Sequence, residues 1–242
     1  MTKGGLTKRN RLNAQSVAII SRPDLRLDWC SYAAAKYAVE HWHYSRSLPG
    51  ARKVYIGVWE NSVFVGAVIF GLGSGSVTNG KRYGLARSHE MAELCRVALQ
   101  ERKTATSRIV SIALRMLGKQ SPKLRLVISF ADPRHGHLGT IYQAGGWIYT
   151  GCTQADVEYY QGGKWRHHRS ATSRAVTVAG LPSRKLLPKH RYLFPLDAEI
   201  RDSILPLAQS YPKRPKDSSE PPATHAGEGG AAPTRTLQNL FP

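Results

Sequence analysis

The feature that most constrains the fold is an alternation of segments with helical period and short β-branched runs. Residues 31–42 and 106–117 carry apolar side chains at helical spacing, whereas 54–59, 63–70 and 124–130 are rich in valine, isoleucine and aromatic residues. Helical spacing predicts amphipathic helices, and short β-branched runs predict strands. Helices that alternate with strands are typical of an α/β fold in which helices cover a sheet. The sequence therefore predicts a central mixed sheet flanked by helices.

Turn residues set the expected order of the other elements. Glu60-Asn61-Ser62 has the chemistry of a tight hairpin turn, and five glycines make 71–84 a long loop. The further elements expected are a strand at 93–99, the helix at 106–117 closed by Gly118, a short helix at 138–144, a strand at 147–150 and a hairpin at 159–178 across Gly162-Gly163.

Composition sets the expected domain limits. The chain has 242 residues, enough for one well-buried core. We expect a basic arm at 1–15, a catalytic domain at 16–210 and a disordered tail at 211–242, because the tail is rich in proline, lysine, serine and glycine and cannot form a core.

The charge balance points to a polyanionic partner. Lysine and arginine total 35 against 16 acidic residues, a formal charge of +19. Nucleic acid neutralises such a charge, whereas no apolar stretch is long enough to predict a membrane span. Cys30, Cys95 and Cys152 are widely spaced and are expected to be reduced core residues. With no secretory signal recognised, we expect a cytoplasmic protein of a bacterial host.

A first polar cluster follows the helix at 31–42. His43 and Tyr44 are candidates for proton transfer, and Ser45, Arg46 and Ser47 extend the cluster towards Pro49 as candidate nucleic-acid contacts. The alternative is a helix cap with a packed aromatic side chain.

A second cluster follows the strand at 124–130. Ligands gather beyond the carboxyl ends of strands in α/β sheets, which makes Asp132 a candidate catalytic residue. Its alternative role is to cap the next short helix. Together with His43, the side chains of Asp132, His135 and His137 are also candidate ligands of iron or zinc, although a one-residue spacing is weak evidence for a metal.

A third cluster surrounds the expected start of the helix at 106–117. Free backbone N–H groups there, together with Arg102, Lys103, Thr106 and Ser107, would form a phosphate cradle for a donor cofactor. The alternative is that Thr106 or Ser107 caps the helix while the cations are solvated.

Basic and aromatic side chains are densest in the last expected hairpin. Lysine and arginine can hold a phosphate backbone while tryptophan or tyrosine stacks on a base. The candidate nucleic-acid contacts of this kind are Arg134, Lys164, Trp165, Arg166, His168 and Arg169, with Tyr83 of the glycine-rich loop as a stacking residue. The alternative is a merely exposed hairpin.

The order of elements, with Gly139-Thr140-Ile141-Tyr142-Gln143-Ala144-Gly145-Gly146-Trp147 near its end, resembles the GNAT acyltransferases. The resemblance implies that Tyr142 is the acid near the leaving group. The sequence departs from GNAT enzymes at 103–107, where the glycine-rich pyrophosphate loop is missing, and this departure puts an acyl-CoA donor in doubt.

Three motifs at 31–150 resemble the Mom proteins of bacteriophages. They are His-Tyr-Ser-x-Ser-x-Pro, Glu-Leu-x-Arg and Ala-Asp-Pro-x-His-Gly-His-x-Gly-x-Ile-Tyr-Gln-Ala. The resemblance implies conversion of adenine N6 in phage DNA to a carbamoylmethyl-type derivative that protects the DNA from host restriction nucleases. It implies catalytic roles for His43, Tyr44, Asp132 and Tyr142, a donor contact at Arg96, and a bound iron.

We therefore predict that the protein is a transferase that acts on double-stranded DNA with the adenine flipped out of the helix. A carbamoylmethyl group is an isomer of a glycyl group, so the donor is expected to be glycyl-tRNA or an acyl-CoA-type compound. One alternative is a conventional GNAT enzyme that acetylates a protein or small amine with acetyl-CoA. A second alternative is a basic DNA-binding protein without catalysis.

Overall fold

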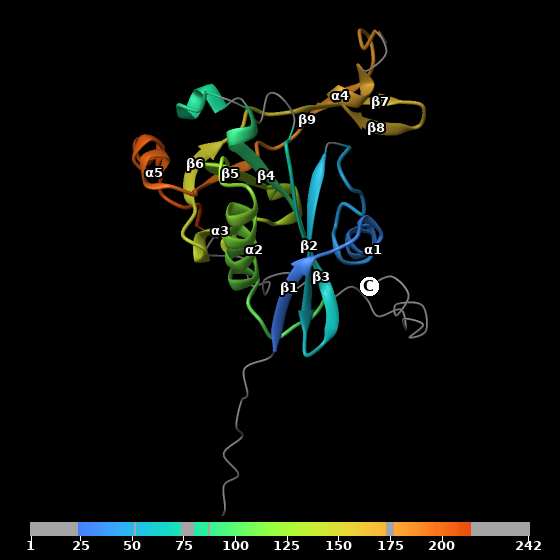
Figure 1. The fold of residues 1–242 in the computed structure, drawn as a ribbon. Helices are drawn as coiled ribbons and strands as arrows, with labels where there is room; N and C mark the ends of the chain where they lie inside the picture. Colours follow the sequence, from blue (N-terminus) through green and yellow to red (C-terminus); the bar gives the residue numbers. More distant parts are fainter. Residues whose placement is uncertain (1–23, 51, 74–79, 87, 173–176, 214–242) are drawn as a thin grey trace, which may run out of the picture.

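The structure is a computed structural model that describes residues 24–50, 52–73, 80–86, 88–172 and 177–213 (Figure 1). The expected basic arm, part of the glycine-rich loop and the expected tail from 214 onward lie outside these residues. Within the described ranges, no helix has the length and apolar character needed to cross a membrane.

A seven-stranded mixed sheet forms the centre of the fold. Its strand order is β1-β2-β3-β4-β5-β10-β6. The strands are β1 (Leu25–Trp29), β2 (Lys53–Glu60), β3 (Val63–Gly71), β4 (Met91–Leu99), β5 (Leu126–Ala131), β6 (Ile148–Cys152) and β10 (His190–Pro195). β4 and β5 pair in parallel, and every other neighbouring pair in this sheet is antiparallel. The predicted mixed sheet is therefore confirmed.

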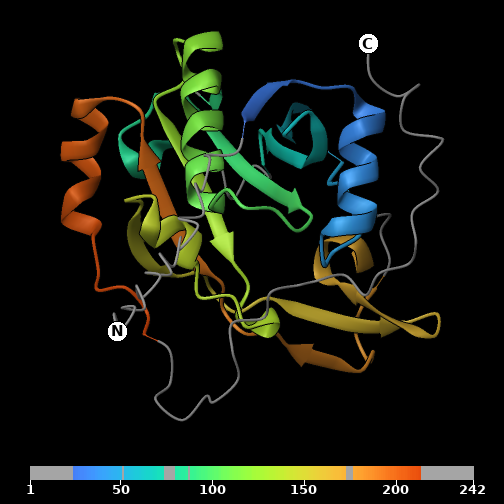
Figure 2. The same ribbon diagram turned by 90° about the horizontal axis from the view of Figure 1, so that it is seen from below.

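Helices cover both faces of this sheet (Figure 2). They are α1 (Tyr32–Trp42), α2 (Thr106–Gln120), α3 (Thr140–Ala144) and α5 (Ala198–Ile204). Short 3-10 turns lie at Gly80–Tyr83, Ser88–Glu90, Pro133–His135 and Leu205–Leu207. Apolar residues of α1 pack with Ile69, whereas those of α2 pack with Val68 and Phe70. Because successive strand residues point to opposite faces, α1 and α2 lie on opposite sides of the sheet.

Local sequence explains where these elements begin and end. The Ser31 side chain accepts the N–H of Ala34 at 3.2 Å and caps α1. Asn61 and Ser62 have φ of 51° and 64°, which suits a two-residue hairpin turn between β2 and β3. The predicted end of α2 at Gly118 is wrong, since the helix continues to Gln120.

A three-stranded accessory sheet is inserted between β6 and β10. It consists of β7 (Val157–Gln161), β8 (Lys164–His167) and β9 (Ser183–Lys185) in the order β8-β7-β9, with α4 (His168–Ala171) after β8. The predicted hairpin across Gly162-Gly163 is present, but its second strand ends at His167 instead of continuing to 178.

Three other expectations differ from the structure. Tyr83 is 5% exposed and packs in the core with Leu85 and Met91, so it does not form part of an open loop. Cys152 is an exposed cysteine, whereas Cys30 and Cys95 are half-buried. Tyr211 donates a hydrogen bond to the Trp147 carbonyl oxygen at 2.8 Å, so the folded region extends beyond residue 210.

Candidate active site

The site lies where β4 and β5 separate. Their last parallel pair is Glu93 with Ile128. Just beyond it, the β3–β4 register shifts so that Cys95 is an extra residue between Leu94 and Arg96, a bulge that bends β4 away from β5 (Figure 2). The ends of the two strands are then free to receive side chains from other segments.

Tyr142 lies beneath this opening and is 7% exposed. The Ser129 hydroxyl lies 2.9 Å from the Leu94 carbonyl oxygen and 2.7 Å from the Tyr142 hydroxyl. The Ser129 hydroxyl donates to the Tyr142 oxygen, so the phenol's own proton is not used in this contact. Burial raises the pKa of Tyr142 to about 12, which keeps its proton in place at neutral pH.

The turn after α1 presents His43. The N–H of Ser45 donates to Nδ1 of His43 at 3.1 Å, and the Ser45 hydroxyl lies 2.8 Å from the same nitrogen. A backbone N–H can only donate, so Nδ1 is an acceptor and a neutral ring carries its proton on Nε2. Nε of Arg96 donates to the Ser47 carbonyl oxygen at 3.2 Å and ties this turn to β4.

The Tyr44 ring joins this turn to the segment after β5. Its centroid lies 4.3 Å from that of His43, 4.2 Å from that of His135 and 5.2 Å from that of His137. Burial raises the pKa of the Tyr44 phenol, and the negative charge of Asp132 acts in the same direction. Tyr44 therefore stands between the two polar clusters and remains 40% exposed.

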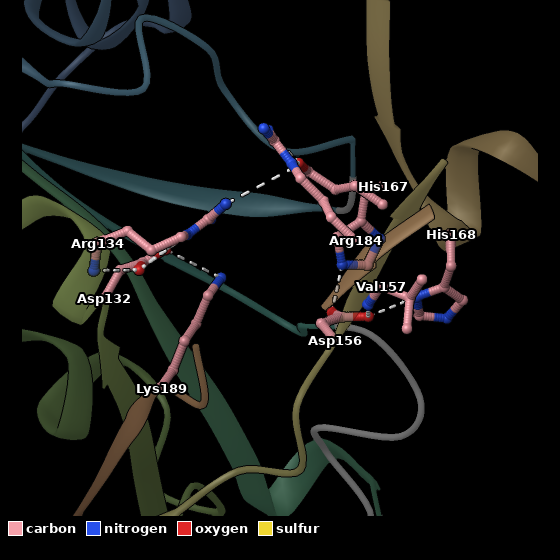
Figure 3. Close-up of polar contacts among 9 residues, drawn as sticks. Asp132, Arg134, Asp156, Val157, His167, His168, Arg184 and Lys189 are labelled. Atoms are coloured by element: carbon pink, nitrogen blue, oxygen red, sulfur yellow. Dashed lines mark hydrogen bonds and ion pairs between the residues drawn. The ribbon is translucent and has the colours of Figure 1, made fainter. Parts of the chain in front are cut away.

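Asp132 is a buried carboxylate held by cations (Figure 3). Arg134 donates to it through its backbone N–H at 3.0 Å and through Nη2 at 2.8 Å, and Nζ of Lys189 lies 3.8 Å away. Burial alone would raise the pKa of Asp132, but the Arg134 hydrogen bonds and the two positive charges outweigh it and hold the pKa below its usual value. The carboxylate is therefore ionised at neutral pH.

The structure thus brings His43, Tyr44 and Asp132 together around one opening, with Tyr142 below it. Asp132 also caps the 3-10 turn at Pro133–His135, so the alternative capping role is present in a residue that lies at the opening. The four candidate metal ligands are not among the side chains whose donor atoms all lie within 4.8 Å of one another. In the described part of the chain, the one group of at least three histidine, cysteine or acidic side chains that suits a metal is Asp156, His167 and His168.

The expected phosphate cradle already holds a carboxylate of the chain itself. Glu60 is 7% exposed and accepts the N–H groups of Lys103 and Thr104, each at 2.8 Å. Nη2 of Arg102 contacts the Thr106 hydroxyl, and no side chain caps α2 at Ala105. Two of the backbone donors proposed for a donor phosphate are therefore bound to Glu60.

The expected nucleic-acid contacts fall into two groups. Arg46, Ser47 and Arg134 are exposed and Ser45 is half-buried beside the site. On the accessory sheet, Lys164 and Trp165 are exposed, and Arg166 and His168 are half-buried. The side chain of Arg169 lies outside the described structure, and the burial of Tyr83 removes it as a stacking surface.

Comparison with known proteins identifies the family. The model of the Mom protein family matches residues 24–213, which is nearly the whole described chain. The chain belongs to the Mom protein family.

A curated Mom relative supports this assignment. The methylcarbamoylase mom of Escherichia phage Mu is 27% identical over 205 residues, which cover 78% of this chain and 84% of that protein.

Solved structures with weaker likeness are acyltransferases. An N-acyl amino acid synthase from uncultured soil microbes has a TM-score of 0.43 at 12% identity and covers 75% of this chain and 94% of its own. A probable GNAT-family acetyltransferase from Chromobacterium violaceum has a TM-score of 0.39 at 13% identity, covering 80% of this chain and 97% of its own.

Several polar residues of this Mom-family site were not expected from the sequence. Ser129 and Lys189 contact the expected residues Tyr142 and Asp132, and Glu60 fills the expected cradle. Ser129 lies three residues before Asp132 in an otherwise apolar strand. A polar residue at that place could have been predicted from the sequence to face the site. Lys189 and Glu60 are far from their partners in sequence, so only the strand pairing reveals them.

Proposed function

We propose that this Mom-family chain transfers a carbamoylmethyl-type group, or its glycyl isomer, to N6 of adenine in phage DNA and so protects that DNA from host restriction nucleases. The observation that carries the proposal is the convergence of Tyr44, Asp132 and Tyr142 at the opening between β4 and β5. The family assignment and the named activity of the phage Mu relative support it.

The ionised Asp132 carboxylate is the proposed base. The lone pair of adenine N6 is delocalised, but once the nitrogen attacks the donor carbonyl it becomes positively charged and strongly acidic. A carboxylate is then basic enough to take the proton. His43 is less suited to this step, because its Nδ1 already accepts the Ser45 N–H. We propose instead that a proton on Nε2 stabilises the carbonyl oxygen on which negative charge develops.

Tyr142 is the proposed acid. Its phenol remains protonated because burial raises the pKa to about 12, and its hydrogen bond to Ser129 fixes its orientation. A leaving oxygen or sulfur would take this proton as its bond to the acyl carbon breaks.

The donor is proposed to be a glycyl ester such as glycyl-tRNA. Because the Glu60 carboxylate accepts the Lys103 and Thr104 N–H groups, these two donors are not available to a CoA pyrophosphate. The high positive charge of the chain favours a nucleic acid carrier. A rearrangement after glycyl transfer would give the carbamoylmethyl isomer.

Double-stranded DNA with a flipped adenine is the proposed substrate. Trp165 is 38% exposed and lies beside Tyr160, with the Arg184 guanidinium 4.4 Å from its ring centroid. Exposed aromatic rings with neighbouring cations suit base stacking and backbone contacts.

The test is mass spectrometry of nucleosides from DNA of cells that express the chain. We expect a new adenosine species with the wild type and with Asp202→Asn, an exposed control, and none with Asp132→Asn. Unmodified DNA from cells that hold abundant folded wild type would contradict the proposal. Transfer of labelled glycine from glycyl-tRNA to DNA tests the donor, and tight CoA binding without DNA would favour a conventional acetyltransferase.

A further inference from the structure

Three metal-ligating side chains converge on the accessory sheet, away from the Asp132 site (Figure 3). Asp156 immediately precedes β7, His167 ends β8 and His168 begins α4. One ligand atom from each lies within 4.8 Å of the other two. Two stretches of the insertion, one at residue 156 and one at residues 167–168, therefore present donors to one point.

The contacts within this group define the ligand atoms. Nε2 of His167 contacts Oδ2 of Asp156, and Nδ1 of His168 lies 2.6 Å from Oδ1 of the same carboxylate. The Val157 N–H donates to Oδ1 at 3.0 Å and orients the carboxylate. Supporting hydrogen bonds of this kind are typical of carboxylates that bind metals.

The donor set selects a class of metal. Two imidazoles and one carboxylate suit divalent transition metals such as zinc and iron, whereas magnesium and calcium prefer oxygen ligands alone. The side chains of His167, His168 and Asp156 are 33%, 41% and 29% exposed. Solvent can therefore reach the group and supply the remaining ligands.

We propose that Asp156, His167 and His168 bind one divalent transition metal ion, with its other coordination positions open to water. None of the three side chains takes part in the proton transfers proposed for the transferase reaction.

The metal would also fix the face of the accessory sheet that adjoins the candidate active site. Glu158, two residues after Asp156, lies on the same face of β7, accepts Arg184 at 2.7 Å and pairs with Arg134 at 3.7 Å. Arg134 in turn holds Asp132. The ion would thus anchor the strand that carries this chain of ion pairs.

The first test is metal titration of the full chain after removal of metals with a chelator. Co²⁺ is followed by visible absorption and Zn²⁺ by calorimetry. We expect one ion per wild-type chain and an affinity at least about tenfold weaker for Asp156→Asn and His168→Ala, since even loss of a supporting group costs about 10–100-fold. His89→Ala, an exposed histidine outside the group, is the matched control and should bind as the wild type does. Absence of uptake by the wild type, or equal affinities in all four proteins, would overturn the proposal.

A second test needs no variant and so does not depend on the folding of α4. Diethylpyrocarbonate modifies accessible histidines, and mass spectrometry locates the modified residues. With Zn²⁺ bound, His167 and His168 should be protected while His89 reacts as before. Unchanged reaction of His167 and His168 in saturating Zn²⁺ would show that the three side chains form only a hydrogen-bonded cluster.

Discussion

The hydroxyl groups of Ser129 and Tyr142 lie 2.7 Å apart directly below the point where β4 and β5 separate. In this contact the Ser129 hydroxyl donates to the phenol oxygen of Tyr142, and it also lies 2.9 Å from the Leu94 carbonyl oxygen. Because Tyr142 accepts in this contact, its own phenol proton is the one that we assign to the leaving group.

Tyr142→Phe removes that proton and keeps the ring. We expect DNA modification to fall about 10²–10⁴-fold, the usual contribution of a general acid, while the free energy of unfolding falls by about 1 kcal/mol. Tyr211→Phe is the matched control, because it also removes a hydrogen-bonded tyrosine hydroxyl, in this case one that donates to the Trp147 carbonyl oxygen. Nucleoside mass spectrometry and urea unfolding measure both effects. Equal modification by the two variants would exclude Tyr142 as the acid.

Glu60→Gln replaces the carboxylate that accepts two backbone N–H groups before α2. The amide keeps one acceptor oxygen but turns an N–H₂ group towards the other donor. We expect a loss of about 1.5–3 kcal/mol in unfolding free energy, as for hydrogen bonds to a charged group. Glu101→Gln, at an exposed position nearby, should change it by less than about 0.5 kcal/mol. Similar urea midpoints for both variants would contradict the assigned role of Glu60.

Asp132 should make stability depend on acid pH. Its pKa is lower in the folded chain than the usual value of about 3.9, so the folded state binds fewer protons than the unfolded state. The resulting stabilisation is complete above about pH 5 and is lost as pH falls below about 4 through the folded pKa. We therefore expect the stability gap between wild type and Asp132→Asn to be constant at neutral pH and to shrink below about pH 4. Urea unfolding at several pH values measures this stability gap. A gap that widens in acid would show that the pKa of Asp132 is not lowered in the folded chain.

Trp165 and Lys164 should contribute to nucleic-acid affinity in different ways. Trp165→Ala should weaken binding by about 1–3 kcal/mol at any salt concentration, because it removes a stacking ring. Lys164→Ala should instead remove about one phosphate contact, and so reduce the magnitude of the slope of log affinity against log salt concentration by about 1. Fluorescence anisotropy with a DNA duplex at several salt concentrations separates the two. Lys119→Ala, at the end of α2, serves as the control and should leave the affinity unchanged.

Gly139 should tolerate substitution less well than Gly136. Both have left-handed backbones, with φ of 78° and 68°, so alanine costs about 1–2 kcal/mol at either position. A Cβ at Gly139 would also lie 2.6 Å from Cζ of Tyr192, whereas one at Gly136 meets no atom within 4 Å. We expect Gly139→Ala to lower the unfolding free energy by about 1–3 kcal/mol more than Gly136→Ala does, as overpacking usually costs. If thermal unfolding showed the same loss of unfolding free energy for both variants, the close approach of Gly139 to Tyr192 of β10 would be contradicted.

The sequence predicts the elements whose pattern is local. The helix at 31–42, the hairpin that follows it and the strand before Asp132 all carry their own periodicity and turn residues, and the structure confirms them. The helical period of α2 is also clear, but Gly118 is an unreliable stop because glycine is tolerated near a helix end at a modest cost.

The parts that could not be predicted depend on distant pairing. β10 is short, ends at Pro195 and carries the polar residues His190 and Arg191, so its sequence does not suggest a central strand. The burial of Tyr83 depends on packing with α5, more than a hundred residues away. Contacts of this kind are set by strand order, which residue patterns do not encode.

The place of β10 between β5 and β6 has a consequence for synthesis of the chain. A ribosome produces β5, β6 and the whole accessory sheet before it produces β10. Until then, the two strands that β10 will join each expose an unpaired edge, which is a template for wrong pairing and aggregation. The central sheet is therefore complete only after β10 has left the ribosome, and a nascent chain that stops at residue 189 would lack the strand that joins β6 to the rest of the sheet.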